Sequence, residues 1–99
     1  MIKIDKTLEN SILTINLGGR LDTTTAPELE AELKASIDEA KSLIFDFKDL
    51  EYISSAGLRV LLGAQKIMNK QGNMVIKNVN DVIMEIFEVT GFSDILTFE

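Results

Sequence analysis

The sequence of 99 residues contains no cysteine and no histidine. Without cysteine, the chain has no disulfide bond, no catalytic thiolate and no cysteine-bound metal. Without histidine, it has no Ser-His-Asp triad, no histidine metal ligand and no ordinary general base near neutral pH. A hydrolase built on the serine pair Ser54 and Ser55 would need a lysine as its base, and the turn itself holds none. We therefore expect no enzyme, no metal site and no cofactor.

The sequence also lacks long apolar runs and an excess of basic charge. No apolar run approaches the roughly 20 residues that cross a bilayer, and residues 1–6 lack the continuous apolar core of a signal peptide. The net charge of −6 argues against nucleic acid and anionic lipid, because both bind a basic face. We expect a cytoplasmic protein with no nucleic-acid partner and no membrane partner.

Proline occurs only at Pro27, and no glycine- or serine-rich linker interrupts the chain. The length suits one domain with one core, so we expect a single domain over residues 1–99. Alternation of apolar and polar residues, or a dense apolar run, predicts four strands: residues 2–5, 13–17, 43–47 and 74–76. Apolar residues at helical spacing predict three helices: residues 25–41, 56–70 and 81–90.

Several local details follow from these patterns. Thr25 with Glu28 has the pattern of a capping box. Gly72 is expected as the left-handed end of the second helix. Asn80 or Asp81 should cap the third helix, and residues 92–98 should form a helical turn and an edge strand. The apolar run at 43–47 predicts a central strand that is buried on both faces.

The resulting order is β-β-α-β-α-β-α, with a possible last strand. It predicts an α/β fold in which helices flank a mixed, mostly parallel sheet of four to five strands. In such sheets, functional sites gather where strands end and helices begin. The loop around Asp22 and the serine turn both lie at such positions. They share one rim if the strands that precede them run parallel.

The serine pair admits three interpretations: a helix cap, a phosphate acceptor or a nucleophile. One hydroxyl suffices for a cap, and the small residues Ala56 and Gly57 leave both hydroxyls open to a large partner. Gly57 costs roughly 1 kcal/mol in a helix relative to alanine. Either the close approach of a partner or the packing of the helix on the sheet explains it. For Asp22, a turn that ends in a cap at Thr25 is the simpler interpretation, with partner contact as the alternative.

Four segments, in order, resemble the STAS domain family (sulphate transporter and anti-sigma factor antagonist). Residues 19–26 are similar to its G-x-L-D-x-x-T-A segment, and residues 43–50 to its central strand with the following D-L. Residues 52–58 are similar to its F-M-D-S-S-G-L signature, and Gly91-Phe92 to its closing segment. The resemblance covers nearly the whole chain and, within the family, is greatest to the bacterial stand-alone anti-sigma factor antagonists.

The resemblance implies a function in partner switching. The unmodified antagonist binds an anti-sigma factor that is also a serine kinase, and the kinase phosphorylates the antagonist, which ends binding. A serine phosphatase restores the unmodified form. The alternative within the family is a scaffold or transport-complex subunit that is never phosphorylated. We expect a monomer.

Position by position, the phosphate acceptor of the family falls on Ser55, with Ser54 as second choice. Two neighbours depart from the family pattern: Ser54 replaces the preceding aspartate, and Ala56 replaces the following serine. The expected partner-binding residues lie in the serine turn, the helix that follows it and the Asp22 loop: Asp22, Thr23, Ser54, Ser55, Ala56, Gly57 and Arg59.

Overall fold

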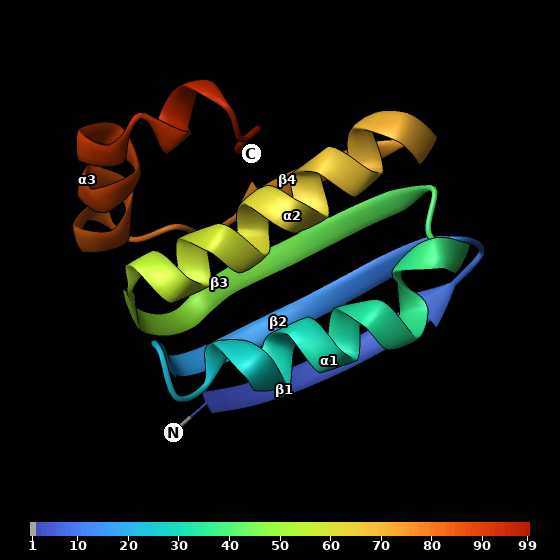
Figure 1. The fold of residues 1–99 in the computed structure, drawn as a ribbon, viewed down its shortest axis with the longest axis horizontal. Helices are drawn as coiled ribbons and strands as arrows, with labels where there is room; N and C mark the ends of the chain where they lie inside the picture. The colour runs from blue at the N-terminus through green and yellow to red at the C-terminus, as the bar shows by residue number, and fades with distance from the viewer. Residues whose placement is uncertain (1) are drawn as a thin grey trace.

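The computed structural model describes residues 2–99, and Met1 lies outside them. The elements follow the predicted order (Figure 1). The strands are β1 (Ile2–Glu9), β2 (Ile12–Leu21), β3 (Ser42–Ile53) and β4 (Asn73–Lys77). The helices are α1 (Ala26–Ser36), α2 (Ser55–Gln71) and α3 (Asp81–Thr90), with 3-10 turns η1 (Ile37–Glu39) and η2 (Phe92–Asp94).

The four strands form one sheet in the order β1-β2-β3-β4. β1 and β2 are an antiparallel hairpin, whereas β2 pairs with β3 and β3 with β4 in parallel. The predicted mixed, mostly parallel sheet is therefore confirmed. The expected last strand is reduced to a single bridge, in which Phe98 lies beside Ile76 along the edge of β4. The Ile76 amide donates to the Thr97 carbonyl at 2.9 Å.

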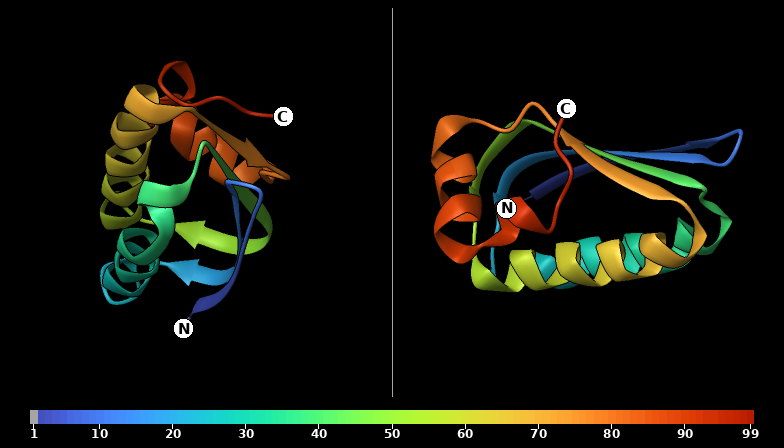
Figure 2. Two further views of the ribbon diagram at one scale, coloured as in Figure 1. Left: turned by 90° about the vertical axis from the view of Figure 1, so that its right-hand side faces the viewer. Right: turned by 90° about the horizontal axis from the view of Figure 1, so that it is seen from above.

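Both long helices lie on one face of the sheet, and α3 closes one end of the molecule (Figure 2). Leu29, Leu33 and Ile37 form the predicted stripe of the first helix and enter the same core as the inward residues of the strands. Phe87 of α3 reaches that core and stacks on Phe47 of β3 with ring centroids 6.4 Å apart. α3 is thereby anchored by its inner face.

The prediction that the central strand is buried on both faces is wrong. Phe45 and Phe47 are fully buried, but Ile44 and Asp46 between and beside them are only half-buried. The reason is that α1 and α2 cover the same face, so the outer face of the sheet has no helical layer. Within the apolar run at 43–47, only the residues that face the helices are fully buried.

β3 is longer than predicted, and it bends. Its register with β2 shifts between Asn16 and Gly18 and again between Gly19 and Arg20. Beyond Phe47 the buried residues of β3 recur at every third position, at Leu50 and Ile53. Such bulges bend a strand and increase its twist. Figure 2 shows the sheet curving toward the helix layer at this end, which brings the end of β3 to the start of α2.

The turns that end the last two helices differ from each other. Gly72, after α2, has an extended φ of 175° and is not left-handed, contrary to the prediction. It is glycine because a Cβ there would overlap the carbonyl of Lys41. α3 has the predicted ends: the Asn80 side chain accepts from the Ile83 amide, and Gly91 is left-handed with φ of 82°. Within residues 2–99, every helix is too short or too polar to cross a lipid bilayer.

Candidate functional site

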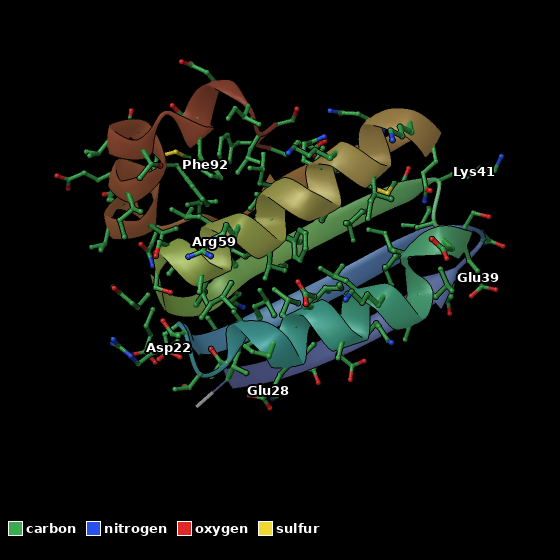
Figure 3. The ribbon with its side chains drawn as sticks, in the orientation of Figure 1. Asp22, Glu28, Glu39, Lys41, Arg59 and Phe92 are labelled. Atoms are coloured by element: carbon green, nitrogen blue, oxygen red, sulfur yellow. The ribbon has the colours of Figure 1, made fainter. Side chains whose placement is uncertain are left out.

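The Asp22 loop and the serine turn share one rim of the sheet, as the sequence predicts for parallel strands. Leu21 pairs with Ile53 at the ends of β2 and β3. The Ser54 amide continues this pairing by donating to the Leu21 carbonyl at 2.9 Å. In Figure 3, Asp22 and Arg59 lie at the same end of the molecule, one on the loop after β2 and the other near the start of α2.

The two serines of the turn have different environments. Ser54 occupies the N-cap position of α2, and its carbonyl accepts from the Leu58 amide at 3.0 Å. Its hydroxyl makes no cap hydrogen bond. That oxygen is buried and has no partner among residues 2–99. Ser55 is the first residue of α2, and it is exposed.

This difference bears on all three interpretations of the pair. Neither a side-chain cap nor a nucleophile is available at Ser54, because its oxygen is enclosed and bonds to no amide of the first turn. Ser55 presents a hydroxyl to solvent beside backbone amides that have no helical partner. The positive end of the helix dipole favours a negative group there. The periodicity of the sequence alone does not predict that one of two adjacent serines is enclosed and the other exposed.

Gly57, one of the expected contact residues, has a packing role in this structure. It is buried. A Cβ at this position would lie 2.8 Å from Cγ of Leu21 and 2.8 Å from Cγ1 of Ile53. These atoms belong to the last pair of the β2–β3 ladder, so the first turn of α2 rests directly on the strand ends. Gly57 therefore sets the position of α2 and of its neighbour Ser55.

The Asp22 loop is held by its own threonines. Oδ1 of Asp22 accepts from the Thr24 hydroxyl at 2.7 Å, the Thr24 amide at 3.0 Å and the Thr25 amide at 3.1 Å. The Thr25 hydroxyl donates to the Arg20 carbonyl at 2.8 Å and accepts from the Asp22 amide at 2.8 Å. Because this hydroxyl is engaged within the loop, it makes no cap bond to α1, and the predicted capping box with Glu28 is wrong.

These hydrogen bonds also set the charge of Asp22. The Thr24 hydroxyl is the main cause that lowers the pKa of the carboxyl group, and the amides of Thr24 and Thr25 add to it. Each of these donors favours the ionised form. Asp22 therefore holds a negative charge at the rim in a fixed orientation.

A groove between α1 and α2 begins at this rim. Its first part is a cavity of about 210 Å³ whose lining includes Thr23 from the loop and Ala56 and Arg59 from α2. A second cavity of about 110 Å³ shares Glu30, Arg59 and Val60 with the first. We call the two together the interhelical groove. Three expected contact residues are thus brought to one surface.

The far part of the interhelical groove was not predicted from the sequence. Gly63 and Ile67 line it. Among residues 2–99, a Cβ on Gly63 would have nothing within 4 Å, so no contact of these residues requires glycine there. A glycine in the middle of a 17-residue helix was the available signal, because it costs about 1 kcal/mol relative to alanine.

Two arginines flank the rim. Arg59 is exposed and takes part in none of the ion pairs found among residues 2–99. The guanidinium of Arg20 lies 4.4 Å from the ring centroid of Tyr52, which fixes it by a cation–π contact. Within the same residues, no group of three acidic side chains is arranged to hold a metal ion. The rim therefore combines an exposed hydroxyl with a fixed carboxylate and an unpaired cation.

Comparison with known proteins gives one consistent family. The STAS domain model matches residues 3–99. The chain is 29% identical over 96 residues to the anti-sigma-B factor antagonist of Bacillus subtilis, covering 96% of this chain and 88% of that protein. It is 39% identical over 97 residues to BtrV of Bordetella bronchiseptica, covering 96% of this chain and 79% of that one.

Among solved structures, the fold is similar to that of the anti-sigma factor antagonist SpoIIAA from Bacillus. The TM-score is 0.77 with its unphosphorylated form, at 17% identity, over 100% of this chain and 87% of that chain. With the phosphorylated form the TM-score is 0.76, at 18% identity, over 100% of this chain and 91% of that chain. The chain therefore has the same fold as both forms.

Two glycines of α2 give a matched test of the packing at the rim. Gly57→Ala should lower the free energy of unfolding by about 1–3 kcal/mol, because the new methyl group would displace Leu21 and Ile53. Gly63→Ala should raise it by about 1 kcal/mol, since the methyl group meets open space and improves helix propensity. Urea unfolding of both variants measures the difference. Equal effects at the two positions would contradict the close contact at Gly57.

A second prediction concerns the charge of Asp22. Thr24→Val should raise the pKa of Asp22 toward its ordinary value, because the main hydrogen bond that lowers it is lost. Thr23→Val is the control, since Thr23 is exposed and donates none of the hydrogen bonds at this carboxylate. NMR titration of the carboxyl carbons gives the pKa in each variant. An unchanged pKa in Thr24→Val would refute this account of the loop.

The sign of the pH effect on stability follows from the lowered pKa. The ionised carboxylate stabilises the folded form above the ordinary pKa of aspartate. This contribution is lost as the pH falls through the lowered pKa of the folded state. In Thr24→Val, the part of the free energy of unfolding that is lost when Asp22 becomes protonated should therefore be smaller than in the unmodified chain.

Proposed function

This chain belongs to the STAS domain family, and on that basis we propose that it is an anti-sigma factor antagonist whose binding is controlled by phosphorylation of Ser55. In the unphosphorylated form it binds an anti-sigma factor that is also a serine kinase. Phosphate on Ser55 ends that complex, and a serine phosphatase restores it. Relatives that carry the name anti-sigma-B factor antagonist support the general role.

The observation that carries the proposal is the contrast between the two serines. Ser55 is exposed at the start of α2, whereas the hydroxyl oxygen of Ser54 is buried. A kinase must bring the acceptor oxygen within reach of a nucleotide phosphate, so only an accessible hydroxyl can serve. This favours Ser55 as the acceptor and removes the support for Ser54 as second choice.

A phosphate on Ser55 is tolerated within the monomer. It adds about −1.5 to −2 charges at the end of α2 where the helix dipole is positive. Arg59 lies four residues along the same helix, a spacing at which side chains are neighbours, and it has no ion pair of its own. The similar TM-scores with the two forms of SpoIIAA agree with a switch that leaves the fold unchanged.

The same phosphate is not tolerated beneath a partner. A protein that covers the serine turn would remove the phosphate from water. The single charge of Arg59 does not balance about −1.5 to −2 charges, so the burial costs several kcal/mol. A change of about 1.4 kcal/mol already alters affinity tenfold. Asp22, which stays ionised nearby, would add repulsion. One phosphate is therefore enough to separate the complex.

The proposed docking surface is the rim together with the interhelical groove. From the rim it takes Asp22, Thr23, Ser55, Ala56 and Arg59. Ser54 contributes its backbone, and Gly57 contributes only by seating α2. The groove extends this surface to Gly63 and Ile67, where the absence of a side chain at Gly63 leaves room for close approach.

We further propose that the protein acts in the cytoplasm and catalyses no reaction. The cavity beside the serine turn is lined by Glu30 and Arg59 but by no lysine, and the sequence contains no histidine. Ser55 thus lacks an adjacent base that would make it a nucleophile. The competing role, a STAS scaffold or transport subunit without phosphorylation, is an outcome of the next test.

The acceptor is tested by incubating the chain with ATP and a serine kinase of the anti-sigma factor type, followed by intact mass and fragmentation. Ser54→Ala should still gain one phosphate, because the buried hydroxyl that it removes is not the acceptor. Ser55→Ala should gain none. Label on Ser54, or on neither serine, would contradict the assignment. No label together with stable binding to a transporter would instead favour the scaffold role.

The effect of charge is tested with Ser55→Asp and Ser55→Asn, which match in size and differ in charge. Ser55→Asp should weaken binding to the same kinase at least tenfold, because a negative group is then enclosed in the complex. Ser55→Asn should stay within a few-fold of the unmodified chain. Calorimetry gives both affinities, and both melting temperatures should stay within a few degrees of that of the unmodified chain, since the helix dipole changes stability only slightly. Equal affinities for the two variants would contradict the switch.

A further inference from the structure

The outer face of α3 carries apolar side chains that the fold does not use. Val89 and Val82 are the most exposed large apolar residues of the described chain, at 80% and 61%. The same helix anchors itself in the core through Ile83 and Phe87, which are fully buried. The exposed surface of these valines contributes nothing to the hydrophobic core.

The two valines form one continuous surface with Ile86, which is half-buried and also packs against the core. Val82, Ile86 and Val89 follow each other at intervals of four and three residues, which places them on one side of a helix. Together with Glu85 and Thr90 they line a shallow cavity of about 290 Å³. We call it the α3 face. It shares no residue with the interhelical groove, and no other element lies outside α3 in Figures 1 and 2.

The charge of α3 and of the segment after it is one-sided, although Glu99 at its end pairs with Lys77 of β4 at 3.4 Å. Residues 81–99 contain five acidic side chains and no basic one, whereas residues 1–80 contain eleven acidic and ten basic side chains. Five of the six excess negative charges of the protein thus lie in its last 19 residues. On α3 itself, Asp81, Glu85 and Glu88 accompany the apolar stripe.

We propose that the α3 face binds an amphipathic helix of another protein, one that presents apolar residues flanked by lysine or arginine. The stripe spans two turns, which suits the helix-in-groove mode of recognition. Its acidic surroundings select a basic partner and repel nucleic acid and anionic membranes. A second copy of this chain is disfavoured, because a symmetric contact would bring the acidic residues of both copies together.

This second surface acts independently of Ser55 and does not rest on the proposed function. Asn80, which caps α3, donates from its side chain to the Leu50 carbonyl of β3 at 3.0 Å. α3 therefore stands at the same end of the sheet as the serine turn. A partner bound there stays beside the rim in either phosphorylation state.

The test uses three synthetic 14-residue helical peptides as probes, titrated into the ¹⁵N-labelled full chain. One combines leucine and lysine, one leucine and glutamate, and one serine and lysine. The leucine–lysine peptide should bind at least tenfold more tightly than the others and move amide signals of residues 81–95. Equal binding of the leucine–glutamate peptide, or shifts confined to α1 and α2, would overturn the proposal.

Variants separate this surface from the rest of the molecule. Val82→Ser with Val89→Ser should weaken binding of the leucine–lysine peptide at least tenfold, without loss of fold, since both side chains are exposed. Ile67→Ser, which changes an apolar residue of α2 exposed at 41%, is the matched control and should leave affinity unchanged, as should Ser55→Asp. Unchanged affinity in the double variant would contradict the proposal that the α3 face binds a basic helix. A dimer of the unmodified chain that the double variant abolishes would also contradict it, because the partner would then be a second copy.

Discussion

The parallel pairing of β2 with β3 is the constraint on which the candidate site depends. It ends with Leu21 opposite Ile53 and with the Ser54 amide bonded to the Leu21 carbonyl. Gly57 then lets the first turn of α2 rest on these two side chains. The result is a rim where the Asp22 loop, the start of α2 and the mouth of the interhelical groove meet. Each functional proposal for Ser55 starts from this contact.

Much of the fold was predictable because its signals are local. The hairpin, the order of strands and helices, the Asn80 cap and the left-handed Gly91 follow from periodicity and from residue preferences at helix ends. The shared rim followed as well, since parallel strands bring the loops after them to one edge. The burial of β3 did not, because an apolar run does not tell which face the helices cover.

The details that decide function were set by tertiary contacts. Two adjacent serines have the same sequence signal, yet the packed structure buries the hydroxyl oxygen of Ser54 and leaves Ser55 exposed. Thr25 has the pattern of a cap but is engaged by Arg20 and Asp22. Gly57 and Gly63 have the same propensity cost in a helix and opposite environments. Such differences require the packed structure.

We propose that Ser55 presents its hydroxyl within a docking surface, and that a phosphate there excludes the partner without altering the fold. The most direct measurement uses chain with phosphoserine incorporated at position 55 during synthesis, compared with unmodified chain by calorimetric titration with the anti-sigma factor kinase. We expect the phosphorylated chain to lose at least tenfold in affinity, with backbone amide spectra that differ only around the rim. Equal affinity of the two forms, or a spectrum changed throughout the core, would contradict it.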